Sequence, residues 1–265
     1  MNAKVTSAAL MEMKKAGEKI TSLTAYDASF ATILDEAGID IVLVGDSLGM
    51  VLQGKETTLA VSMDDMVYHT KIVAPRCQRA MVVADLPFQS YESPAMAMSN
   101  AARLRDEAGA EVVKLEGGVE MAETVRKLCD EGFEVCGHVG MQPQSIEKYG
   151  GFKVQGRDEE SAKYIIDGAK ALQEAGAAMI VLECIPSVLA ENISKTLTIP
   201  TIGIGAGVDC DGQVLVIYDA LDISGRTPRM AKNFLAEGGN IRDAVARFIA
   251  AVKSREFPAP EHSFS

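Results

Sequence analysis

Five polar side chains interrupt the apolar runs of this sequence at corresponding places, and their types are suited to chemistry. Asp46, Asp85, Glu116, His138 and Glu183 each lie at or near the end of a run rich in Val, Ile, Leu and Ala. If the runs are parallel strands of a barrel, their carboxyl ends meet at the face where active sites form. The spacing therefore predicts that the five side chains converge on one site.

Asp46, Asp85 and Glu116 would form a cluster of carboxylates at this site. Burying unpaired charges is costly, so a cation must neutralise them. Lys114, on the same strand face as Glu116, is one candidate, and a hard divalent cation is another. Oxygen ligands without cysteine suit Mg²⁺ or Mn²⁺, and His138 would also be compatible with Zn²⁺ or Co²⁺. We therefore expect the three carboxylates to hold a divalent metal ion.

Each of these residues also has a structural interpretation. A single Asp after a strand is often a helix N-cap, and a single His in an apolar run is more often a structural residue. Glu183 could pair with a basic side chain, but an apolar setting also makes a carboxylate a stronger base, so it is a candidate general base. Lys114 could be a Schiff-base nucleophile, a clamp for a substrate carboxylate or a counter-ion. Recurrence over successive strands favours a shared site.

The elements that would position these side chains repeat along the chain. Continuous apolar runs suit parallel strands covered on both faces, and the amphipathic stretches between them begin with Ser or Asp and often end in Gly, as helices do. This alternation predicts an α/β fold, a single-domain (β/α)₈ TIM barrel over residues 1–265, with an open doubly wound sheet as the alternative. The predicted strands are 20–27, 40–47, 80–88, 111–118, 133–140, 178–186, 200–207 and 213–222.

Three segments outside this repeat carry separate predictions. Helical patterns at 229–239 and 240–255 predict extra C-terminal helices, followed by a polar tail at 256–265. The long segment 141–160 could be a lid in which Lys153 and Arg157 meet an anionic substrate, or simply a solvated loop. GIGAG (203–207) lacks the full dinucleotide-binding spacing and predicts a tight turn near the pocket.

Composition excludes several classes of partner. The formal net charge of −11 disfavours binding to nucleic acid or anionic membranes. The five cysteines are scattered and form no C-x-x-C motif, so we expect reduced, buried thiols. The N-terminal stretch carries charges throughout and no apolar run is long enough to span a bilayer, which favours a cytoplasmic protein.

The motifs around these residues are similar to those of one family from Thr24 to the C-terminal tail. The chain resembles the 3-methyl-2-oxobutanoate hydroxymethyltransferases, the ketopantoate-forming enzymes of pantothenate biosynthesis. The matching motifs, of which the first and the sixth are especially specific, are LVGDSLGMVLQG (43–54), YHTKIV (68–73), ADLPF (84–88), VKLEGG (113–118), VCGHVGMQPQS (135–145), GGFKVQGR (150–157), VLECIP (181–186), IGIGAG (202–207), DGQVLV (211–216) and EHSF (261–264).

The resemblance implies a cytoplasmic homodecamer of barrels of the phosphoenolpyruvate/pyruvate type. It implies that a hydroxymethyl group passes from 5,10-methylenetetrahydrofolate to 3-methyl-2-oxobutanoate through a Mg²⁺-stabilised enolate. By resemblance, the metal ligands are Asp46, Asp85 and Glu116, the substrate contacts are Asp46, Ser47, Asp85 and Lys114, the proton acceptor is Glu183, and His138 is a pocket residue. A folate-independent metal aldolase, a Schiff-base enzyme built on Lys114 and a non-enzymatic binding protein are the rival hypotheses.

Overall fold

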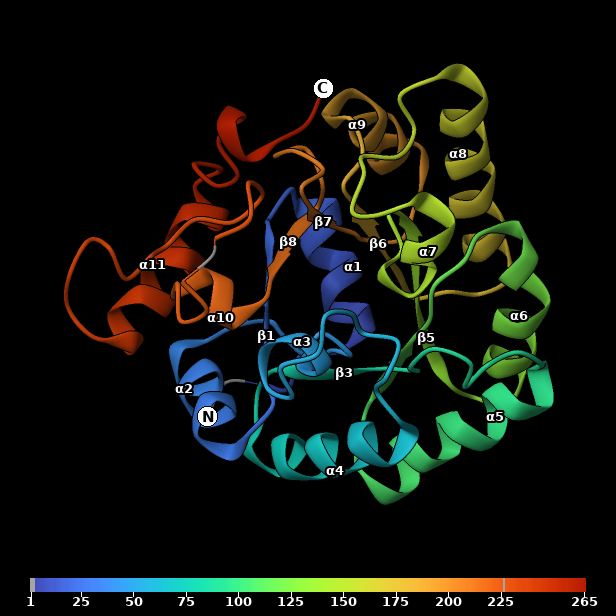
Figure 1. Ribbon diagram of the computed structural model, residues 1–265, viewed down its shortest axis with the longest axis horizontal. Coiled ribbons are helices and arrows are strands. Elements are labelled where there is room, and N and C mark those ends of the chain that lie inside the picture. Colours follow the sequence, from blue (N-terminus) through green and yellow to red (C-terminus); the bar gives the residue numbers. More distant parts are fainter. Residues whose placement is uncertain (1–2, 226) are drawn as a thin grey trace.

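A closed barrel of eight parallel strands forms the centre of the computed structural model, which describes residues 3–225 and 227–265 (Figure 1). Each strand pairs with its neighbours in chain order, and β8 pairs with β1, which rules out the open sheet. All eight strands fall within or at the edge of the predicted apolar runs. They are β1 (Ile20–Thr24), β2 (Ile41–Val44), β3 (Met81–Asp85), β4 (Val112–Lys114), β5 (Glu134–Gly140), β6 (Met179–Glu183), β7 (Thr201–Ile204) and β8 (Gly212–Leu215).

Helices surround the barrel, and their ends carry the predicted caps. Asp27 accepts hydrogen bonds from the N–H groups of Ser29 and Phe30 at the start of α2, and Ser62 and Asp65 form a capping box at the start of α4. No helix of the described residues is long and apolar enough to cross a membrane. The α-helices are α1 (Ser7–Ala16), α2 (Ala28–Ala37), α3 (Leu48–Val51), α4 (Met63–Val73), α5 (Pro94–Ala102), α6 (Ala122–Asp130), α7 (Ile146–Tyr149), α8 (Glu159–Glu174), α9 (Ser187–Thr196), α10 (Ile217–Ala220) and α11 (Ile241–Lys253).

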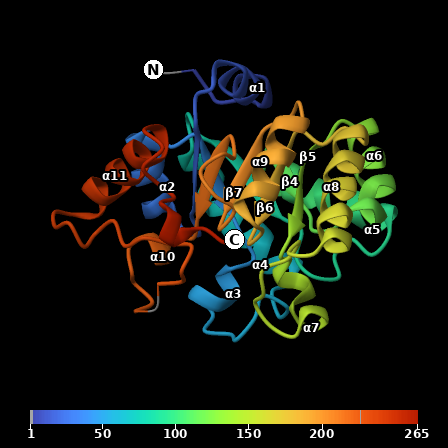
Figure 2. The same cartoon turned by 90° about the horizontal axis from the view of Figure 1, so that it is seen from above.

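The two ends of the barrel are covered differently. Helix α1 lies at the amino ends of the strands, where Val5 and Leu10 pack with Ile20, Met81 and other side chains of the barrel interior. Figure 2 shows α1 at one end of the barrel and α3 and α7 at the other. Because α1 closes the amino end, the carboxyl end is the one left for a site, as expected for this fold.

One predicted helix is absent. The helix predicted at 240–255 is α11, but residues 229–239 form turns instead. Arg247 of α11 donates hydrogen bonds to the carbonyl oxygens of Phe234 and Gly238, and the N–H of Phe234 donates to Ala220. These contacts hold the buried Phe234 ring against Phe248. Hydrogen bonds to distant residues therefore replace those of a helix. Gly238 and Gly239 also disfavour a helix, because glycine has a low helix propensity.

A buried ion-pair network at the amino end predicts a measurable stability effect. Asp40 accepts hydrogen bonds from Arg79, Lys253 and both the N–H and hydroxyl of Thr21. Burial alone would raise the pKa of Asp40, but the bond from Arg79 and the Lys253 charge outweigh it and lower the pKa. We expect Asp40→Asn to destabilise the protein by about 2 kcal/mol at neutral pH.

Urea denaturation of both proteins from pH 7 to pH 3 checks this prediction. Stability that depends on a lowered carboxyl pKa is present above the unfolded pKa of about 4 and is lost as the pH falls through the folded value. The difference between wild type and Asp40→Asn should therefore shrink on acidification. A difference that does not change with pH would contradict the role given to the Asp40 charge.

Candidate active site at the carboxyl ends of the strands

The predicted site residues all lie at the carboxyl end of the barrel, and all except the half-buried Ser47 are buried. Asp85 and Glu183 are the last residues of β3 and β6, and His138 lies in β5. Asp46 and Glu116 come two residues after the ends of β2 and β4. The strands end before the apolar runs do, so these two carboxylates extend from the first residues of the following loops.

An ion pair between two neighbouring strands organises the site. Asp85 and Lys114 are opposite each other in the parallel register of β3 and β4, and Lys114 Nζ lies 2.7 Å from Asp85 Oδ1. The other oxygen of Asp85 accepts a hydrogen bond of 3.0 Å from the backbone N–H of Asp46. Asp85 therefore links three strands, and the Lys114 ammonium is a charge partner rather than a free amine.

Gln144, which the sequence analysis did not select, ties the carboxylates together. Its side-chain amide donates to Asp46 Oδ2 at 2.8 Å and to the carbonyl oxygen of Leu86 at 3.0 Å. Its backbone N–H donates to Glu116 Oε2 at 3.0 Å, and the hydroxyl of Tyr91 donates to its amide oxygen. Gln144 thus brings part of the segment 141–160 directly over the site.

The site carries excess negative charge. Three carboxylates, Asp46, Asp85 and Glu116, surround one ammonium group, that of Lys114. Burial, followed by the charges of Asp85 and Glu116, raises the pKa of Asp46 well above its usual range. Although burial alone would lower it, the three carboxylate charges raise the pKa of Lys114. Lys114 is therefore protonated, and a further cation would be favoured next to Asp46.

His138 lies between Glu116 and Glu183. Its Nδ1 is 3.5 Å from Glu116 Oε1 and its Nε2 is 3.2 Å from Glu183 Oε2, although neither ring nitrogen makes a well-aligned hydrogen bond with any of the described residues. Burial and the Lys114 charge favour neutral His138, but the two carboxylates outweigh them and raise the pKa of His138 to about 9. The protonated ring therefore connects the carboxylate cluster to Glu183.

Ser47 occupies the edge of the site beside Asp46. Its hydroxyl lies 2.8 Å from the hydroxyl of the buried Tyr26. A Cβ on Gly45 would lie 2.9 Å from Ser47 Oγ and 3.5 Å from Asp85 Oδ2, so glycine at this position makes room for both groups. Tyr26 is a second residue that the sequence analysis missed, because a Tyr after an apolar run is an ordinary core residue.

The donor set fits a hard divalent cation. All three candidate ligands offer carboxylate oxygens, and the raised pKa of Asp46 shows that a nearby positive charge would be stabilising. Within the described residues no three His, Cys, Asp or Glu side chains stand together as a preformed metal cluster. Lys114 and Gln144 separate the carboxylates, and their hydrogen bonds compensate part of the charge.

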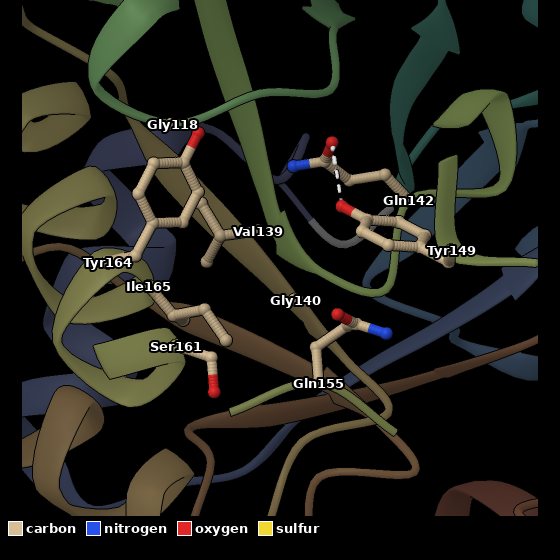
Figure 3. A pocket seen from close by; sticks show the side chains of 9 residues that line it. All are labelled: Gly118, Val139, Gly140, Gln142, Tyr149, Gln155, Ser161, Tyr164 and Ile165. Carbon is tan, nitrogen blue, oxygen red and sulfur yellow. Dashed lines mark hydrogen bonds between the residues drawn. The ribbon is translucent and has the colours of Figure 1, made fainter. Parts of the chain in front are cut away.

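A cavity of about 70 Å³ lies beside the site, under the segment 141–160 (Figure 3). Gly118, two residues after Glu116, and Gly140, which pairs with Glu183, form part of its wall. Tyr149 donates a hydrogen bond to Gln142 across it. The remaining lining residues are Val139, Gln155, Ser161, Tyr164 and Ile165. The cavity therefore combines aromatic rings with amide groups, and Gly140 connects its wall to the strand that carries Glu183.

The fold and the site define an α/β-barrel protein with buried charged side chains at the carboxyl ends of its strands. A phosphonopyruvate hydrolase, solved in complex with oxalate and Mg²⁺, has the same fold with a TM-score of 0.61, at 12% identity over 94% of this chain and 96% of that chain. A 2,3-dimethylmalate lyase, a member of the PEP mutase/isocitrate lyase superfamily, aligns with a TM-score of 0.58, at 15% identity over 94% and 96%. At these identities the likeness concerns the fold alone.

Sequence comparison identifies the family. The family model for ketopantoate hydroxymethyltransferase matches residues 4–260. The 3-methyl-2-oxobutanoate hydroxymethyltransferase of Shewanella loihica is 55% identical over 99% of both chains, and that of Alteromonas mediterranea is 54% identical over 98% of this chain and 99% of its own. The chain therefore belongs to the ketopantoate hydroxymethyltransferase family, which is a family of transferases.

Proposed function

We propose that this enzyme forms ketopantoate by adding a hydroxymethyl group to C3 of 3-methyl-2-oxobutanoate, with 5,10-methylenetetrahydrofolate as the one-carbon donor. The observation that carries the proposal is the buried cluster of Asp46, Asp85 and Glu116 around Lys114, next to Glu183. With a divalent cation bound, such a cluster suits a 2-oxo acid, because the cation and Lys114 would supply the positive charge that the substrate carboxylate and ketone need. Glu183 would supply the base that removes the C3 proton.

Asp46, Asp85 and Glu116 would hold Mg²⁺ or another divalent ion that prefers oxygen ligands. When bound, the ion would withdraw electron density from the ketone of the substrate and so make C3–H more acidic. Ser47 and Lys114 would contact the oxo acid. Because the raised pKa of Lys114 keeps it protonated, it would stabilise negative charge that develops on the ketone oxygen.

Glu183 would act as the general base. Its carboxylate takes the proton from C3, and the electron pair of the C–H bond moves into the enolate. C3 then forms a bond to the methylene carbon of the folate, both carbon–nitrogen bonds of that carbon break in turn, and one water supplies the hydroxyl. The two freed nitrogens of tetrahydrofolate take up the proton that Glu183 removed and the remaining proton of the water. The position of His138 beside Glu183 supports this role, because the charged ring holds that carboxylate at the site.

The folate would enter over the cavity beside Glu183. Pterin is a planar ring system with several hydrogen-bond donors and acceptors, and Tyr149, Tyr164, Gln142 and Gln155 offer rings and amides of matching chemistry. The glutamate tail of folate is anionic. Lys153 and Arg157 lie exposed on the adjoining segment and would meet that tail.

Replacing both Lys153 and Arg157 by alanine should therefore weaken the binding of folate and leave the binding of the oxo acid unchanged. Because exposed charge contacts contribute little each, we expect the KM for the folate to rise about 5- to 10-fold and the KM for the oxo acid to stay unchanged. Steady-state kinetics with each substrate varied in turn measure this. Lys163→Ala, an exposed lysine on α8, is the matched control. An unchanged KM for folate would refute the lid role.

A single assay with components omitted one at a time tests the proposed function. Ketopantoate should form only when the oxo acid, the folate and a divalent cation are all present. Turnover with formaldehyde equivalents that is unaffected by omitting tetrahydrofolate would instead indicate a metal aldolase. Activity that survives EDTA, with borohydride trapping the substrate on Lys114, would indicate a Schiff-base enzyme.

A further inference from the structure

The C-terminal tail reaches back to the carboxyl end of the barrel and packs on the segment that follows Glu183. The carbonyl oxygen of Phe264, the last residue of the EHSF motif, accepts a hydrogen bond of 3.0 Å from the N–H of Ser187, the first residue of α9. Arg229 donates to the carbonyl oxygen of Glu261 at 3.0 Å, and its guanidinium lies 5.1 Å from the centre of the Phe264 ring. These contacts fix the tail at both ends of the motif.

The ring of Phe264 belongs to an apolar group, the tail cluster, that lies at the same end of the barrel as the site. Its members come from loops after β2, β5, β6 and β8 and from the tail. Since β2 and β6 lie on opposite sides of an eight-stranded barrel, a cluster that joins their loops extends across the opening. The tail cluster consists of Leu59, Met141, Ile146, Cys184, Met230 and Phe264.

Cys184, which directly follows Glu183, is the member that links the tail to the site. Its φ angle is +46°, in the left-handed region that is unfavourable for a residue with a side chain. Such a conformation persists only where the surroundings enforce it. The backbone of Cys184 donates to Ile204 at 2.9 Å and accepts from Gln155 at 3.0 Å, and its buried side chain lies in the tail cluster.

Gly205 shows how closely Phe264 approaches this turn. A Cβ on Gly205 would lie 2.9 Å from Phe264 Cε2 and 3.3 Å from Cys184 Sγ. The edge of the ring and the thiol thus converge on the space that the glycine leaves open. Without the ring, the apolar packing around Cys184 would be reduced, and the left-handed turn would have fewer contacts to maintain it.

We propose that Phe264 is a positioning residue for Glu183: by packing on Cys184 and Gly205, the tail holds the turn that aims the Glu183 carboxylate into the site. This inference rests on the proposed function, in which Glu183 removes the C3 proton. Phe264 acts through Cys184 and does not contact the reacting atoms. Proton abstraction depends on the position of the base, and a displacement of about 1 Å can cost about 100-fold in rate.

The test compares Phe264→Ala with the full-length wild-type protein in two measurements. One is the rate at which C3 of 3-methyl-2-oxobutanoate exchanges its proton with deuterated solvent in the presence of Mg²⁺. The other is the Mg²⁺-dependent affinity for the same oxo acid. We expect exchange and kcat to fall about 10- to 100-fold while the affinity changes less than about twofold.

Three further variants distinguish positioning from general loosening. Phe264→Tyr keeps the ring and should restore most of the exchange rate. Arg229→Met removes the contacts between Arg229 and the tail but keeps the Phe264 ring. It should also lower the exchange rate, by a smaller factor than Phe264→Ala does. Ser263→Ala removes only a bond within the tail, to Ala259, and should behave as wild type.

Two results would overturn the proposal. One is wild-type exchange in Phe264→Ala, and the other is an equal loss of exchange and oxo-acid affinity, which would mean that the tail merely stabilises the whole site. A wild-type protein that shows neither exchange nor product would instead refute the proposed function, and with it the basis for assigning Glu183 as the base.

Discussion

Asp85→Ala is expected to abolish the Mg²⁺-dependent binding of 3-methyl-2-oxobutanoate and to lower kcat/KM by about 1,000-fold or more. Asp85 interacts with both Lys114 and the backbone N–H of Asp46, so its removal takes away a candidate metal ligand and leaves a buried ammonium without its nearest partner. Removing one member of a buried charge pair costs about 3–5 kcal/mol in itself. Calorimetric titration of the oxo acid with and without Mg²⁺ measures the effect.

A matched control shows whether the effect is specific to Asp85 or follows from replacing any aspartate by alanine. Asp106 is exposed and pairs with its neighbour Arg105, so Asp106→Ala should keep both Mg²⁺-dependent binding and activity. Thermal unfolding of Asp85→Ala is needed beside the titration, since a folded variant is required for the comparison. Retained Mg²⁺-dependent affinity in folded Asp85→Ala would contradict the ligand role of Asp85.

Glu183→Gln is the second substitution with a large expected effect. Glutamine keeps the size and most contacts of the side chain but cannot accept the C3 proton. General bases contribute about 100- to 10,000-fold, so kcat and the rate of C3 exchange should fall by that factor while binding of the oxo acid stays near the wild-type level. Nuclear magnetic resonance of the substrate in deuterated solvent follows the exchange directly.

One result for Glu183→Gln would exclude Glu183 as the general base. If the variant exchanges the C3 proton at the wild-type rate, another group is the base. His138 would then be the first residue to test, because Glu183→Gln removes one of the two carboxylates that keep its ring protonated. Glu159→Gln changes an exposed residue at the start of α8 and serves as the control, because it should leave the exchange rate unaffected.

The barrel could be predicted from the sequence because its strands are covered on both faces and therefore appear as uninterrupted apolar runs. Asp46, Asp85, Glu116 and Glu183 could be selected for the same reason, since a charged residue at the end of such a run is conspicuous. Their convergence follows from topology alone, because the carboxyl ends of all eight strands lie at one end of the barrel.

The residues that connect the site could not be predicted in this way. Gln144 reaches Asp46 across 98 positions of sequence, and its polar side chain in a loop carries no periodic signal. Tyr91 and Tyr26 each contact the site through a hydroxyl group. Their rings pack like those of other core tyrosines, so the sequence gives no sign of this contact. The available signs of Gln144 were the unusual length of the segment 141–160 and its place in the motif VCGHVGMQPQS (135–145).

The C-terminal region shows the limit of pattern-based prediction most clearly. Residues 229–239 have a helical pattern, but Arg247 supplies the hydrogen bonds that a helix would otherwise make. The contact between Phe264 and the turn after Glu183 depends on a tail that follows the last strand by some fifty residues. The homodecamer, the cytoplasmic location and the identity of the metal stay predictions.

The most direct test of the central claim is deuterium exchange at C3 of 3-methyl-2-oxobutanoate, measured with wild-type protein with and without Mg²⁺ and with and without tetrahydrofolate. If the carboxylate cluster holds a cation that activates the oxo acid, exchange requires Mg²⁺, stops on addition of EDTA and proceeds without the folate. Exchange that continues unchanged in EDTA, or that is absent when Mg²⁺ is present, would contradict the account.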